Sequence, residues 1–132
     1  MDLEETIDLV AGREQVVDVL ADLASYAEWL DIVSLAERAG VEADDRPVWN
    51  VELRARIGPF ARTKRLRMVR TVMEVGPDRT DLVFTRREDG ARDYSEWTLS
   101  VSVDDVGVDR CRVSLQLHCG GSLWTPGRLE RV

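Results

Sequence analysis

The chain has few of the residues from which metal sites and disulfide-stabilised folds are built. Its 132 residues include one histidine, two cysteines and a single lysine among 18 basic residues. One histidine excludes a histidine-rich metal site, and Cys111 and Cys119 lack the close cysteine spacing that zinc prefers. No apolar run approaches the roughly 20 residues that a membrane-spanning helix needs. The acidic start, Met-Asp-Leu-Glu-Glu, does not resemble a signal peptide.

Acidic residues outnumber basic ones in this chain. The 25 acidic residues give a net charge of −7, which argues against general binding to nucleic acids or anionic membranes. Cys111 and Cys119 lie on one predicted strand, roughly 26 Å apart at about 3.3 Å per residue, so we expect two reduced thiols. These features predict a cytoplasmic protein with one domain over residues 1–132, and a high arginine content with one lysine is typical of GC-rich bacterial genomes.

The first 30 residues predict a strand followed by a helical hairpin. Residues 3–11 place Ile7 and Leu9 in alternation with polar residues, which is the period of a strand. Residues 13–30 change to apolar positions at helical spacing, with a break near Asp22 that favours two short helices.

The remainder predicts strands divided by turns. We expect strands within residues 31–40, 48–57, 64–75, 80–88, 94–103 and 110–119, with glycine-rich or proline-containing turns between them. Three of them have one apolar and one polar face, as in the alternation of Leu115 and Leu117 with Gln116 and His118. This pattern indicates an antiparallel sheet with one dry face. A change of parity in residues 64–75 predicts a bulge near Met68.

The end of the chain predicts a hinge into a helix. Gly120 and Gly121 supply a sharp turn, and Thr125-Pro126 is a typical helix start. His118, beside Cys119, is therefore interpreted as a solvent-facing residue at the end of a strand, on the face opposite Leu117.

Residues 16–33, 95–101 and 113–124 resemble the START-like, or SRPBCC, superfamily, and within it the polyketide cyclase/dehydrase and lipid-transport group. The resemblance implies an α+β helix-grip fold: a curved antiparallel seven-stranded sheet, two short N-terminal helices and a C-terminal helix. The family's closing helix is long, whereas only a turn or two fits here. Either a tail is missing from the sequence, which we favour, or something else covers the sheet. Without a tail, the exposed apolar face predicts a homodimer or a swapped element.

Relatives in this superfamily hold lipids, quinones, polyketides or hormones between sheet and helix. The resemblance therefore implies a ligand cavity, in which Tyr26 would offer a hydroxyl and Arg86 a guanidinium for a carboxylate or enolate oxygen. For each aliphatic residue the alternative is ordinary core packing, but four tryptophans favour a cavity. The expected lining is Tyr26, Trp29, Trp49, Leu53, Met73, Phe84, Arg86, Trp97, Leu99, Leu115, Leu117 and Trp124.

Three functions remain open. The first is a non-enzymatic carrier or sensor of a hydrophobic small molecule, with no catalytic residue, cofactor or metal. The second is a cyclase/aromatase-type enzyme, which needs polar groups in the cavity such as Tyr26 and Arg86. The third is an interaction module that docks an acidic partner or RNA through a basic strand. That strand carries Arg62, Lys64, Arg65, Arg67 and Arg70, whose alternative role is a solvated outer face.

Overall fold

The computed structural model describes residues 2–90 and 93–120 of the chain. Two short helical segments follow the first strand, and the other strands follow them. The elements are β1 (Asp2–Leu9), α1 (Arg13–Leu20), η1 (Leu23–Glu28), β2 (Val33–Val41), η2 (Ala43–Asp45), β3 (Pro47–Ile57), β4 (Phe60–Val75), β5 (Arg79–Arg86), β6 (Trp97–Gly107) and β7 (Arg110–Cys119).

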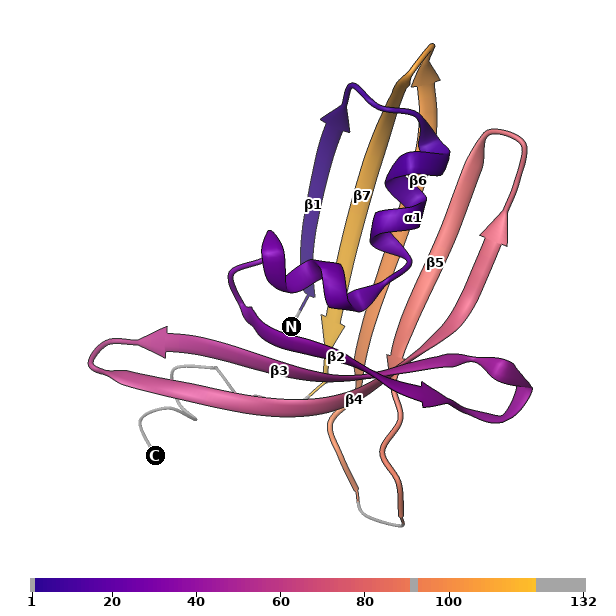
Figure 1. Cartoon of the computed structure of the whole chain (residues 1–132). Helices are drawn as coiled ribbons and strands as arrows, with labels where there is room; N and C mark the ends of the chain where they lie inside the picture. The colour runs from indigo at the N-terminus through magenta and orange to yellow at the C-terminus, as the bar shows by residue number, and fades with distance from the viewer. Residues whose placement is uncertain (1, 91–92, 121–132) are drawn as a thin grey trace.

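All seven strands form one antiparallel sheet, in the order β1-β7-β6-β5-β4-β3-β2. The sheet bends strongly, so that β2, β3 and β4 cross the direction of the other four strands, and α1 and η1 lie inside the bend (Figure 1). The predicted helix-grip architecture is therefore confirmed for the sheet and the N-terminal helices. The expected C-terminal helix over residues 125–132 lies outside the described residues.

The break between the two helical segments is built by Asp22. Its side chain caps η1 by accepting a hydrogen bond of 3.0 Å from the backbone N–H of Ala24. The other side of the break is set by α1, which buries Val16, Val17 and Leu20 against the sheet. Two short helices therefore form, as the sequence predicts.

A bulge in β4 allows the sheet to bend, but it lies at Thr71 rather than near Met68. The β4–β5 register shifts between Arg70, opposite Phe84, and Val72, opposite Val83. The sequence pattern placed it too early because Val69 is fully buried on the outer face, opposite Val48. In the sequence, an apolar residue on the outer face looks the same as a shift of the apolar positions to the other face of the strand, which is the sign of a bulge.

The core lies between the inner face of the sheet and the helices. Its centre is an aromatic group in which Phe84 packs edge-on against Tyr26 and Trp49, with ring centroids 6.2 and 5.7 Å apart. The indole N–H of Trp49 donates to Asp22 Oδ1 over 3.0 Å, so the cap of η1 also fixes the largest core side chain. Cys111 and Cys119 are buried thiols that are not joined in a disulfide.

Arg13 ties the start of α1 to the β4–β5 turn and to β5 and β6. Its guanidinium donates to the carbonyl oxygens of Gly76 and Pro77, each over 2.8 Å, and to the hydroxyl of buried Thr80 over 2.9 Å. It also forms an ion pair of 3.3 Å with Asp105 on β6. One side chain thus joins the helix, the β4–β5 turn and the central strands.

Replacing Arg13 by alanine should therefore lower the free energy of unfolding by about 2–3 kcal/mol, because charged hydrogen bonds to partly buried acceptors are lost. Urea unfolding followed by circular dichroism measures this. Arg112→Ala is the control, because its ion pair with Asp8 is exposed and screened by solvent, so its loss should change the stability little. Equal losses in both variants would contradict the anchoring role of Arg13.

Candidate functional site

An apolar groove of about 400 Å³ lies between the helices and the strands β1 and β7. It is open to solvent along β1, which is an edge strand of the sheet. Gln15 is the one polar residue among those that line it. The lining residues are Ile7, Leu9, Ala11, Gln15, Val16, Val19, Leu20, Trp29, Val113 and Leu115.

The register of the sheet explains the apolar floor of this groove. Ile7 lies opposite Val113, and Leu115 lies opposite Val101, so strand alternation directs these side chains to the inner face. The helix α1 packs over β6 and does not cover β1. The inner-face side chains of β1, Ile7 and Leu9, therefore stay partly exposed beside α1.

The helical wall of the groove is also apolar. Val16 and Leu20 are buried against the sheet. Val19, on the same helix α1, is 50% exposed. Trp29, which packs on Tyr26 with ring centroids 4.7 Å apart, is 39% exposed. Covering apolar surface of this kind gains about 25 cal/mol per Å², so the groove favours an apolar occupant.

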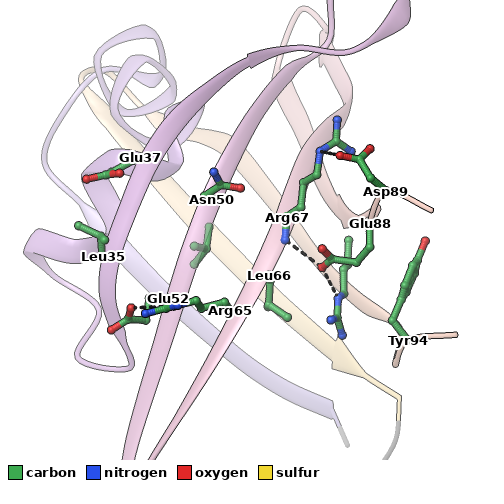
Figure 2. A pocket seen from close by; sticks show the side chains of 12 residues that line it. Leu35, Glu37, Asn50, Glu52, Arg65, Leu66, Arg67, Glu88, Asp89 and Tyr94 are labelled. Carbon is green, nitrogen blue, oxygen red and sulfur yellow. Dashed lines mark hydrogen bonds and ion pairs between the residues drawn. The ribbon is translucent and has the colours of Figure 1, made fainter. Parts of the chain in front are cut away.

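A second cleft, of about 590 Å³, lies where β2, β3 and β4 meet the connection between β5 and β6 (Figure 2). Charged side chains line much of it. The lining residues are Leu35, Glu37, Asn50, Val51, Glu52, Arg65, Leu66, Arg67, Arg86, Glu88, Asp89 and Tyr94.

The charges of this larger cleft largely satisfy one another. Glu88 Oε2 accepts a hydrogen bond from the backbone N–H of Arg67 over 3.0 Å (Figure 2). It also accepts one from Arg86 Nε over 2.7 Å. Arg67 Nη1 also donates to Glu42 Oε2 over 3.0 Å. The side chain of Glu88 thus accepts a hydrogen bond from the backbone of β4 just beyond the end of β5. We therefore take the smaller, apolar groove as the candidate site, since the charges of the cleft already hold the fold together.

The residues proposed from the sequence to line a cavity divide into several groups. Trp29 and Leu115 line the groove. Leu99 and Leu117 are half-buried on the same inner face, Met73 is exposed, and Trp124 lies outside the described residues. The others that are apolar or aromatic pack in the core: Tyr26, Trp49, Leu53, Phe84 and Trp97.

The two polar candidates, Tyr26 and Arg86, both have protein partners. The hydroxyl of Tyr26 donates to the carbonyl oxygen of Leu20 over 2.9 Å, and burial raises the pKa of Tyr26 far above its ordinary value. Arg86 Nη1 donates to the hydroxyl and carbonyl oxygens of Ser95, each over 3.1 Å, and its guanidinium lies 5.1 Å from the ring centre of Tyr94. Neither group points into the apolar groove.

Strand alternation splits the basic stretch of β4 between two faces. Arg65 and Arg67 lie opposite Glu52 and Asn50, on the outer face. Arg70 lies opposite Phe84 and donates to the carbonyl oxygen of Ala21 over 3.0 Å. The stretch is therefore not one continuous patch.

The groove residues of β1 and α1 were not among the sequence-based candidates. The alternation of Ile7 and Leu9 and the helical spacing of Val16 and Val19 were visible. What the sequence did not indicate is that β1 pairs with β7 and lies beyond the cover of α1.

Residues 1–131 match the sequence profile of the family described as polyketide cyclase/dehydrase and lipid transport. The chain belongs to this family. Among curated protein sequences, none matches the chain. No helix of the described residues is long and apolar enough to cross a membrane, and these residues place no group of three or more histidine, cysteine or acidic side chains to hold a metal ion.

Solved structures with the same fold are similar over nearly the whole chain. Human STARD10 is 11% identical with a TM-score of 0.71, and the match covers 98% of this chain and 55% of that one. A START superfamily protein from Mycobacterium smegmatis is 15% identical, with a TM-score of 0.65 and coverage of 98% and 83%. The Zhui aromatase/cyclase from Streptomyces sp. R1128 is 17% identical, with a TM-score of 0.61 and coverage of 92% and 67%.

This family member spans little more than half the length of STARD10, and at these identities the likeness establishes the fold alone. The START-like superfamily predicted from the sequence is confirmed. The groove lies between the sheet and the helices of that fold.

The structural role assigned to the polar cleft predicts a pH dependence at Glu42. Hydrogen bonds from Arg67 and Arg87 lower the pKa of Glu42 below its ordinary value of 4.5. A lowered pKa in the folded state means that the ionised form stabilises the fold. This contribution is present above pH 4.5 and is lost as the pH falls through the folded-state pKa.

Glu42→Gln should therefore be less stable than the wild type near pH 7, and the difference should shrink near pH 3. Urea unfolding at both pH values measures it. Glu37→Gln is the control, since Glu37 is an exposed carboxylate of the same cleft. A Glu42→Gln difference that stays constant across the pH range would show that the ion pairs are not its source.

Proposed function

We propose that this protein binds and carries a hydrophobic small molecule, such as a lipid, a quinone or a polyketide-like chain, in the groove between α1 and β1–β7. The observation that carries the proposal is the apolar lining of this groove, in which nine of the ten residues are apolar. The family to which the chain belongs is described in part by lipid transport.

The size and chemistry of the groove suit a small apolar ligand. Its volume of about 400 Å³ falls within the roughly 300–1,000 Å³ that is usual for ligand pockets. Trp29 offers a flat aromatic face, and Val19 and Leu115 offer aliphatic walls. Gln15, exposed at the start of α1, supplies an amide for one polar end of a ligand.

A cyclase-type activity would need more than this groove provides. Enolisation of a poly-β-keto chain requires acid/base groups in contact with the reacting carbons. The amide of Gln15 does not titrate, and the hydroxyl of Tyr26 and the guanidinium of Arg86 are engaged elsewhere in the fold. A carrier, in contrast, needs only an apolar lining, which the groove provides.

Val19→Glu should weaken binding of a neutral hydrophobic fluorophore such as N-phenyl-1-naphthylamine by at least about tenfold. A carboxylate at this position would have to lose water when the ligand enters. Fluorescence titration measures the affinity. Because Val19 is already 50% exposed, the substitution should leave the fold intact.

Val108→Glu is the matched control, since Val108 is 91% exposed in the β6–β7 turn, outside the groove. It should bind the fluorophore as the wild type does. Equal affinity of all three proteins, or no binding by the wild type, would overturn the proposal. Native mass spectrometry of the purified protein then identifies any apolar molecule that accompanies it.

A further inference from the structure

The hairpin of β3 and β4 extends beyond the rest of the sheet. From the pair Arg54–Thr63 to the pair Ile57–Phe60, its two strands pair only with each other in the described structure, because β5 first pairs with β4 at Met68. The base is joined to the body where the backbone N–H of Arg54 donates to Ile32 O over 2.8 Å. This two-stranded ribbon projects from the molecule (Figure 1). Together with the next two residues of β4, Lys64 and Arg65, which pair with Leu53 and Glu52 at its base, it is here called the hairpin arm, residues 54–65.

The hairpin arm has the opposite charge to the rest of the chain. It contains five basic residues and no acidic residue. The remaining 13 basic residues, 18 less these five, are outnumbered by all 25 acidic residues. The molecule is therefore strongly polarised, with a basic projection on an acidic body. The five are Arg54, Arg56, Arg62, Lys64 and Arg65.

Basic residues occur on both faces of the arm, and the two on the inner face, Arg62 and Lys64, are half-buried. By the strand register, Arg54 and Arg65 belong to one face, whereas Arg62 and Lys64 belong to the other. Arg65 forms an ion pair of 3.4 Å with Glu52, but its side chain is 84% exposed. An exposed pair of this kind is worth little, so Arg65 remains able to contact an anionic partner.

The tip of the arm is apolar and exposed. It turns at Gly58, whose positive φ of 59° suits glycine, and continues through exposed Pro59 to Phe60. The side chain of Phe60 is 67% exposed. An exposed aromatic ring beside arginines combines an apolar contact with ionic ones, as at the surface of a bilayer, where basic residues attract anionic headgroups.

We propose that the hairpin arm docks this protein on an anionic lipid bilayer, with Phe60 entering the interfacial layer and the surrounding arginines contacting lipid headgroups. The acidic body is repelled by the same surface, so the molecule approaches with the arm first. A single-stranded RNA partner would instead require several aromatic side chains for base stacking, and the arm carries Phe60 alone. This inference goes beyond ligand binding, since it concerns where a bound ligand would be exchanged.

Sedimentation with phosphatidylcholine vesicles, with and without phosphatidylserine, tests the proposal. The wild type should bind the vesicles that contain phosphatidylserine, and binding should fall as salt is added, since the screening length is only about 10 Å at 0.1 M. The double variant Arg54→Gln/Arg65→Gln should lower the partition coefficient more than tenfold, because each basic residue near the surface contributes roughly fivefold. Arg110→Gln/Arg112→Gln carries the same change of charge on β7, includes one exposed ion pair, and should bind as the wild type does.

A second pair of variants tests the tip. Phe60→Ser should weaken vesicle binding by about tenfold, whereas Val108→Ser, in the exposed β6–β7 turn, should not change it. Equal losses in the arm and β7 variants, or RNA binding by the arm without vesicle binding, would overturn the proposal. Fluorophore binding, measured in parallel, should be unchanged in every arm variant, so a failure of docking is distinguished from a failure of the groove.

Discussion

The described structure depends on the burial of one apolar sheet face, which its short helical segments cover only in part. The strands present a continuous inner face, whereas α1 and η1 together supply 14 helical residues to cover it. These segments are placed over the centre by the carboxylate of Asp22, which caps η1 and accepts the indole N–H of Trp49. Among the described residues, the centre is therefore a buried aromatic core, and the inner face near β1 forms an open apolar groove.

The same difference in burial distinguishes the polar groups that stabilise the fold from the residues of the candidate groove. Tyr26 and Arg86 have the chemistry of ligand-binding residues, yet each is held by nearby protein atoms. The larger cleft is similar, since Glu42 and Glu88 neutralise the arginines around it. Apolar surface without a partner, rather than polar groups in a pocket, distinguishes the groove. This is why we propose a carrier rather than an enzyme.

The hairpin arm concentrates charge that the whole-chain sum conceals. A net charge of −7 predicts no attraction to anionic surfaces when it is spread over the molecule. The arm carries five basic residues and the exposed ring of Phe60, and it projects from the rest of the sheet. Local charge and shape, rather than composition, determine which surfaces such a molecule approaches.

The sequence by itself determined the local elements: the alternation in β6 and β7, the break at Asp22 and a bulge in β4 all follow from the spacing of apolar residues. Its placement of the bulge failed because Val69 is buried on the outer face, which periodicity cannot distinguish from the inner one. Only the tertiary structure decided the site. Alternation assigns side chains to a face, but the pairing of β1 with β7 and the limited reach of α1 decide which part of that face stays uncovered.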